Sequence, residues 1–193
     1  MLYNLPNGSQ TTYPPFVAAL VKPGDAILAT LTPDKADAWH MASCIPGEAG
    51  ELFTPLRDHD IGGRKLDREN LIEELGDIEF YVEGLRRITD ILYEETIPDD
   101  LVVLASDYTY LPQTAADVFD VVKKWVIYNK PLDRAALVHK LYLLETVLAA
   151  IREACGISRA EVLQANVTKL GVRYANLAYS DAAAQQRADK TIH

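Results

Sequence analysis

A run of apolar residues between positions 68 and 93 constrains the fold of this chain more than any other feature. The apolar residues recur at steps of three and four, and the last interval is two such steps long. These steps match the 3.6-residue period of an α-helix and not the two-residue period of a β-strand. The sequence therefore predicts a long amphipathic helix from about Arg68 to Tyr93. Its apolar positions are Leu71, Leu75, Ile78, Val82, Leu85 and Leu92.

A helix is also expected before this one. Thr32 is a good N-cap because Pro33 follows it at the first helical position. Pro46 lacks a backbone N–H and is expected to kink or break this helix, and Pro55 is expected to weaken it again.

The rest of the chain predicts further helices and no convincing strand. Helices are expected over 115–129, 134–155 and 158–178, and residues 98–112 read as a linker with some apolar content. Asp67, Asp133 and Ser158 are the expected N-caps of the helices that follow them, and Gly156 is the expected stop after residue 155. The fold class is therefore all-α, a helical bundle. The expected organisation is an irregular lead-in over 1–31 with one short helix near 25–31, a helical domain over 32–178, and a polar tail over 179–193.

Part of the sequence repeats. Residues 65–87 and 131–153 share seven identities in twenty-three positions at a constant offset of 66, including the tripeptide Leu-Asp-Arg at the start of each helix. The pattern indicates a duplicated hairpin, the first copy over 32–95 and a degenerate second copy over 115–155, followed by a distal helix. The alternative is that two amphipathic helices resemble each other.

Composition and charge exclude several classes of function. The formal charge is −9, which argues against duplex nucleic acid or an anionic membrane as a partner. No apolar run approaches the ~18 residues of a membrane span, and the start of the chain does not resemble a signal peptide. Cys44 and Cys155 have no CxxC spacing, which gives no sign of zinc or a disulfide framework. A cytoplasmic location is expected.

Two pairs of carboxylates are candidates for metal binding. Glu48 and Glu51 form one pair, and Glu74 and Asp77 form the other. Each pair has i, i+3 spacing, so its two side chains share one helix face. Four carboxylates from two antiparallel helices suit Mg²⁺, with Mn²⁺ as a substitute. Gly50 and Gly76 lie inside the two motifs and are expected to let the two helix backbones approach closely.

Acidic pairs are common on exposed helices, so metal binding needs further support. A ferritin-like di-iron site requires Glu-x-x-His, and none of the four histidines has a Glu three residues before it. The sequence also has no P-loop and no GxSxG motif.

Several segments together resemble the phage-type MazG-like all-α nucleoside triphosphate pyrophosphohydrolases, which are related to the dimeric dUTPases. GEAGEL at 47–52 and EELGDIEFYVEGL at 73–85 are similar to the acidic signature of that family. Asn166-x-x-Lys169-x-x-x-Arg173-Tyr174 is similar to its second signature. The ending YSDAAAQQRADK at 179–190 is similar to the tail of phage-encoded members.

The resemblance implies hydrolysis of a (d)NTP to the monophosphate and pyrophosphate. Glu48, Glu51, Glu74 and Asp77 would be the catalytic and metal-binding residues, with Mg²⁺ as cofactor. The substrate is expected to be a deoxynucleotide, a purine and first of all dGTP. A homo-oligomer, dimer or tetramer, is implied as well. The expected substrate-binding residues are Asn166, Lys169, Arg173, Tyr174, Arg187, Lys190 and His40.

The repeat implies one metal centre per chain. At the offset of 66, Glu74 corresponds to Lys140 and Asp77 corresponds to Leu143, neither of which is a ligand for a divalent cation. Two other classes of function stay open at this point. One is a non-catalytic helical module that binds a nucleotide or a protein, and the other is a structural repeat protein.

Overall fold

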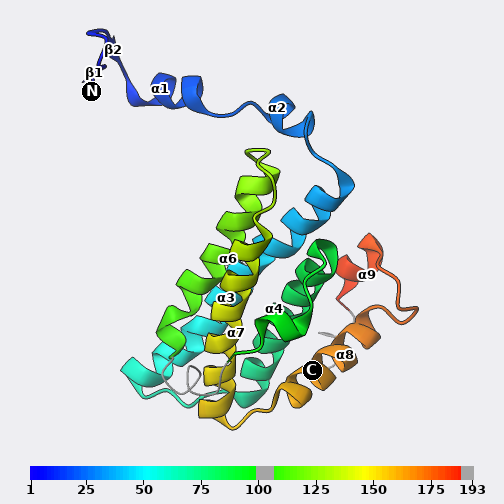
Figure 1. Ribbon diagram of the computed structural model, residues 1–193. Coiled ribbons are helices and arrows are strands. Elements are labelled where there is room, and N and C mark those ends of the chain that lie inside the picture. Colours follow the sequence, from blue (N-terminus) through cyan, green and yellow to red (C-terminus); the bar gives the residue numbers. More distant parts are fainter. Residues whose placement is uncertain (99–106, 188–193) are drawn as a thin grey trace.

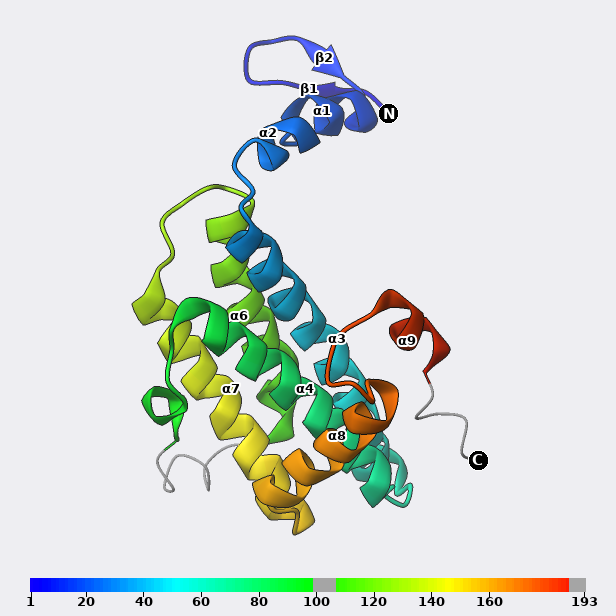
Figure 2. The ribbon, with the colours of Figure 1, turned by 90° about the vertical axis from the view of Figure 1, so that its right-hand side faces the viewer.

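The computed structural model describes residues 1–98 and 107–187. Its main body is a bundle of four long helices, α3 (Pro33–Gly62), α4 (Arg68–Thr89), α6 (Leu111–Val126) and α7 (Arg134–Cys155), drawn in Figure 1. A further helix, α8 (Arg159–Arg173), packs across α4, and the short α9 (Asp181–Gln186) follows it, as Figure 2 shows. The prediction of an all-α fold is confirmed.

Side-chain caps start the main helices at the predicted positions. The Thr32 hydroxyl accepts a hydrogen bond from the amide of Lys35 at 3.3 Å. Asp67, Asp133 and Ser158 cap α4, α7 and α8 in the same way. Each cap satisfies an amide that has no partner inside the helix, which fixes where the helix begins.

The core lies between the four helices. Its fully buried residues follow the helix period on each of them. Examples are Ala42 and Ile45 on α3, Leu75 and Ile78 on α4, Val118 and Val122 on α6, and Leu141 and Leu144 on α7.

The expectation that Pro46 would break the first long helix was wrong, because α3 runs without interruption through both Pro46 and Pro55. A proline inside a helix costs about 3 kcal/mol. Here the helix has buried residues on both sides of each proline, including Ile45, Ala49 and Leu52. Burial against α4 and α6 outweighs the loss of the two hydrogen bonds.

Several other helix boundaries differ from the prediction. Helix α6 ends at Val126 and not at residue 129, and α8 ends at Arg173 and not at residue 178. Helix α4 ends at Thr89 and not at Tyr93, because Asp90 adopts the left-handed conformation with φ 53°. Leu92 therefore lies outside the helix and is 62% exposed. Helix α6 begins at Leu111, within the stretch read as a linker, because Pro112 is well placed in the first turn of a helix. Residues 99–106 of that stretch lie outside the described part of the chain.

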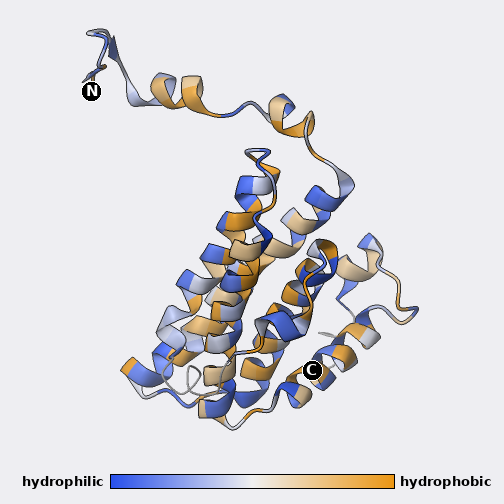
Figure 3. Ribbon diagram, in the orientation of Figure 1, coloured by the Kyte–Doolittle hydropathy of each residue, from blue (hydrophilic) through white to orange (hydrophobic). Residues whose placement is uncertain are grey.

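The lead-in over 1–31 is more regular than expected. Two short strands, β1 (Tyr3–Asn4) and β2 (Gln10–Thr11), pair antiparallel around a turn in which Gly8 has φ 83°. Helices α1 (Tyr13–Leu20) and α2 (Gly24–Leu28) follow, and neither contains a buried residue. The segment extends away from the bundle, and α1 is coloured largely as hydrophobic in Figure 3.

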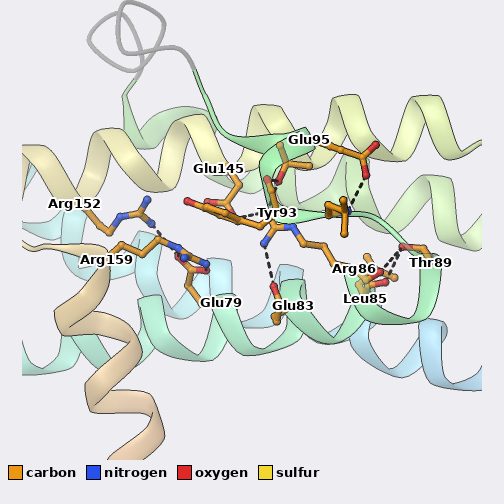
Figure 4. Close-up of polar contacts among 12 residues, drawn as sticks. Glu79, Glu83, Leu85, Arg86, Thr89, Tyr93, Glu95, Glu145, Arg152 and Arg159 are labelled. Carbon is orange, nitrogen blue, oxygen red and sulfur yellow. Dashed lines mark hydrogen bonds and ion pairs between the residues drawn. The ribbon is translucent and has the colours of Figure 1, made fainter.

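Buried ion pairs join α4 to α7 inside the bundle (Figure 4). Arg86 on α4 contacts Glu145 on α7 at 2.7 Å, and Arg152 on α7 contacts Glu79 on α4 at 3.2 Å. Arg159, in the first turn of α8, donates to both oxygens of Glu79 at 2.9 and 2.8 Å. The contacts therefore fix the position of α8 as well as the pairing of α4 with α7.

Within the described ranges, no helix combines the length and the apolar character needed to cross a membrane.

Candidate metal centre

Three carboxylates converge where α3 faces α4. One oxygen from each of Glu48, Glu74 and Asp77 can be chosen so that all three lie within 4.8 Å of one another. Glu48 comes from the middle of α3, and Glu74 and Asp77 come from the second and third turns of α4. The apolar neighbours Ala49 and Leu75 are buried in the core, which fixes both helix faces and aims the acidic side chains at the same place.

The carboxylates disturb one another's ionisation. Burial raises the pKa of Glu74 from 4.5 to about 7, and the negative charges of Glu51 and Asp77 add to this rise. Burial and the charge of Asp77 also raise the pKa of Glu48. Both shifts have the causes expected when like charges share a half-buried site without enough positive charge.

Glu51, the fourth predicted ligand, is exposed and lies outside the three-residue cluster. Its charge nevertheless contributes to the raised pKa of both Glu48 and Glu74. Glu51 therefore lies at the rim of the centre, close enough to act on it through space.

Helix α8 brings an ammonium group and an amide to the cluster. The Nζ atom of Lys169 contacts the two carboxylate oxygens of Asp77 at 2.5 and 2.7 Å. It also contacts Glu73 at 3.4 Å. The side-chain amide of Asn166 donates to Asp77 at 3.1 Å. Two residues of the second predicted signature therefore meet the first signature in space.

The glycines act differently from the prediction. A Cβ atom on Gly50 would meet nothing within 4 Å, so no close approach requires that glycine. A Cβ atom on Gly76 would lie 3.0 Å from the Cβ of Asn166, so this glycine makes room for α8 and not for α3. The close approach of α3 to α4 occurs at Gly84, where a Cβ atom would lie 2.4 Å from the sulfur of Met41.

Most of the other predicted substrate-binding residues lie in α8 or in the segment that follows it. Arg173 is in the last turn of α8, one turn beyond Lys169. Arg187 follows α9, and its charge lowers the pKa of Glu48, which places it near the cluster. Tyr174 is at the C-cap of α8, and its ring packs against Tyr179 with centroids 5.9 Å apart. Lys190 lies outside the described residues.

His40, the one predicted substrate-binding residue on α3, lies away from the carboxylates. His40 is exposed two turns before Glu48, and its ring lies 6.3 Å from the ring of Tyr81. Trp39, the residue before His40, packs against Phe119 with centroids 4.9 Å apart and belongs to the core.

Sequence reasoning missed two residues beside the centre. Tyr81 lies four residues after Asp77, and Cys44 lies four residues before Glu48, so both share the face that carries the carboxylates. Burial and the Cys44 thiol raise the pKa of Tyr81, with smaller effects from Glu48 and Asp77. Helical spacing from the acidic residues was the signal that could have identified both.

The donor set fits a hard divalent cation. Its members offer only oxygen atoms, which Mg²⁺ and Mn²⁺ prefer. The contact between Lys169 and Asp77 shows that the cluster already attracts positive charge.

Comparisons with known proteins found no matching family model, no matching curated protein and no matching solved structure.

Proposed function

We propose that this protein is a Mg²⁺-dependent nucleoside triphosphate pyrophosphohydrolase. The observation that carries the proposal is the convergence of Glu48, Glu74 and Asp77 on one point, with Lys169 beside them. Carboxylates that gather around a cation and a nearby ammonium group are the parts needed to bind and cleave a polyphosphate. The proposed substrate is a deoxynucleoside triphosphate, with dGTP as the first candidate.

Glu48, Glu74 and Asp77 would hold the metal, and Glu51 would complete the set from the rim. Bound Mg²⁺ would neutralise these carboxylates, bind oxygens of the triphosphate and lower the pKa of a water molecule. The high pKa of Glu74 predicts that metal binding releases a proton near neutral pH.

Residues of the centre and of α8 would also act on the attacking water and on the substrate. In the proposed reaction a water oxygen attacks the α-phosphorus, the bond to the bridging oxygen breaks, and pyrophosphate leaves. Glu51 or Glu48 takes the proton of the water. Lys169 and Arg173 stabilise the charge that collects on the leaving pyrophosphate, and Asn166 adds a hydrogen bond.

The proposal extends to the architecture and the setting of the protein. We propose that the bundle is of the MazG and dimeric dUTPase type and arose by duplication of a helical hairpin. It would work as a homo-oligomer in the cytoplasm, or in the host cytoplasm if a phage encodes it. Adjusting or cleansing the nucleotide pool is the role that suits such an activity.

A direct assay tests the proposed activity. The purified protein is incubated with each of the eight common ribo- and deoxynucleoside triphosphates and Mg²⁺. Phosphate is then measured with and without added inorganic pyrophosphatase. We expect phosphate only when the pyrophosphatase is present, together with the nucleoside monophosphate as the second product.

Two variants make the assay specific for the site. Asp77→Asn should lose most of the activity, because it removes a ligand charge and keeps the shape of the side chain. Asp120→Asn is the matched control, because Asp120 lies on α6 and contacts Lys123 and Lys124 there. Equal activity of the wild-type protein and Asp77→Asn would contradict the assignment of the site.

A further inference from the structure

The contacts between α4 and α7 are reciprocal. Glu79 pairs with Arg152, and Glu145 pairs with Arg86. Glu145 lies 66 positions after Glu79, and Arg152 lies 66 positions after Arg86. A two-fold axis produces such paired contacts, because residue i meets j on the other copy while j meets i.

A second set of ion pairs follows the same rule. Arg68 at the start of α4 contacts Glu161 on α8 at 2.5 Å, and Arg134 at the start of α7 contacts Glu95 at 2.7 Å. Arg134 and Glu161 again lie 66 positions after Arg68 and Glu95. The 3-10 helix η1 (Tyr93–Thr96) therefore corresponds to the beginning of α8.

The same two arginines also make matching contacts to the backbone. Arg68 donates to the carbonyl of Gly156 at 3.1 Å, and Arg134 donates to the carbonyl of Asp90 at 2.8 Å. Asp90 and Gly156 lie 66 positions apart, and both adopt the left-handed conformation, with φ 53° and 62°. General similarity between amphipathic helices does not produce matched contacts of this kind, which point to an internal two-fold axis.

The axis assigns the metal centre an equivalent position between α6 and α7. Helix α3 corresponds to α6 at an offset of 69, at which buried Ala49 matches buried Val118 and Glu48 matches Asp117. Glu74 matches Lys140 at the offset of 66. Asp117 and Lys140 are in contact at 2.8 Å. The second hairpin thus has an ion pair where the first has two converging carboxylates.

The charges at the second position are balanced from within the protein. Lys140 contacts Asp117 from α7, and Lys123 contacts Asp120 from the next turn of α6. Lys124 also contacts Asp120, at 2.6 Å. At the first position, by contrast, oxygens of three carboxylates lie within 4.8 Å of one another, and Lys169 contacts Asp77 from α8.

We propose that the α6–α7 hairpin contains a latent divalent-metal site, in which the ammonium group of Lys140 takes the place of the ion. Asp117 and Asp120 are the ligands that this site retains. Lys140 and Leu143 stand where the first hairpin has Glu74 and Asp77, so two ligand charges have been lost. Tyr142 stands where the first hairpin has Gly76, the glycine that makes room for α8. The inference rests on the metal centre proposed for α3 and α4.

Restoring the ligands tests the proposal in the full-length chain. The triple variant Lys140→Glu, Tyr142→Gly, Leu143→Asp and the wild-type protein are titrated with Mn²⁺ by calorimetry. We expect the variant to bind about twice as many ions per chain as the wild type. A wild type that binds no Mn²⁺ would refute the proposed metal centre, and the latent site with it. A wild type that binds Mn²⁺ and a variant that binds no more would overturn the latent site alone.

A single substitution keeps the proposal testable if the triple variant does not fold. Lys140→Glu adds a third carboxylate to the second hairpin, whereas Lys140→Gln removes the ammonium group without adding a ligand. Both variants should unfold at a lower temperature than the wild type in a chelator. Added Mn²⁺ should raise the unfolding temperature of Lys140→Glu by more than it raises that of Lys140→Gln. Equal shifts for the two variants would overturn the proposal.

Discussion

Replacing Glu74 by Gln should stabilise the metal-free protein and strongly reduce the stabilisation that it gains from metal. Glu74 lies among Glu48, Glu51 and Asp77, and its pKa is raised to about 7. A carboxyl with a raised pKa destabilises the folded state wherever it must ionise there. The amide of Gln has a similar shape and no charge, so it removes that cost and one metal ligand together.

The size of the effect follows from the pKa. A rise from 4.5 to about 7 corresponds to at most ~3.4 kcal/mol. Water screens a half-buried group, which reduces the expected value to about 1–2 kcal/mol. Below pH 4.5 both folded and unfolded chains hold the proton, so Glu74 costs nothing. The cost grows between pH 4.5 and 7 and is complete above pH 7.

Urea unfolding followed by circular dichroism measures the effect. With a chelator at pH 8, Glu74→Gln should be about 1–2 kcal/mol more stable than the wild type, and at pH 5 the difference should be small. Mn²⁺ at 100 times its dissociation constant should stabilise the wild type by about 2.7 kcal/mol and the variant far less. Glu153→Gln, at an exposed position of α7, is the control and should change neither result.

The reasoning would be refuted by a Glu74→Gln variant that is less stable than the wild type at pH 8 in the chelator. It would also be refuted by a variant that gains as much stability from Mn²⁺ as the wild type does.

Other substitutions test the proposed catalytic roles of Lys169 and Glu51 and the stability that the buried ion pairs provide. Lys169→Met removes the ammonium group beside the centre, so Mn²⁺ should bind at least as tightly while pyrophosphate release slows on the order of 10²-fold. Glu51→Gln should reduce turnover strongly without lowering stability, as measured by pyrophosphate release and urea unfolding, because this residue is exposed. Arg86→Met should cost about 3–5 kcal/mol in urea unfolding, because it leaves a buried carboxylate unpaired. Arg152→Met, its counterpart, should cost clearly less, because Arg159 still binds the carboxylate that Arg152 contacts. Equal losses of stability in the two variants would show that Arg159 does not compensate for the loss of Arg152.

Local patterns were enough to predict most of the helices. The N-caps at Asp67, Asp133 and Ser158 were found because a side chain bonds to amides two or three residues away. The stop at Gly156 was found because glycine tolerates a positive φ. Such signals involve neighbours in sequence and need no knowledge of the rest of the fold.

Errors arose where distant contacts outweigh local preference. Pro46 predicts a helix break locally, but burial of α3 on both sides keeps the helix intact. Asp90 ends α4 without a glycine, and Arg134 from the other hairpin donates to its carbonyl. Neither outcome can be read from the residues nearby.

The candidate site could be predicted only in part for the same reason. The i, i+3 spacing correctly placed Glu74 and Asp77 on one face, and the structure adds Glu48 from α3. Spacing within one helix does not say how two helices align along their length. Glu51 was therefore predicted as a metal ligand equal to the other three carboxylates, although it lies at the rim of the centre. The contact of Lys169 with Asp77 depends on how α8 crosses α4, which no local pattern encodes.

The contrast between the two hairpins supports the proposal that the carboxylates of α3 and α4 bind a cation. On α6 and α7, Asp117 and Asp120 are each paired with lysine, as expected where stability alone matters. On α3 and α4 the carboxylates face one another, and Lys169 is the one cation that contacts Asp77 among the ion pairs of the described residues. Lys169 offsets only part of this repulsion, and keeping the remaining charges together favours a further requirement for them. A bound cation is the simplest such requirement, because it converts the repulsion into binding energy.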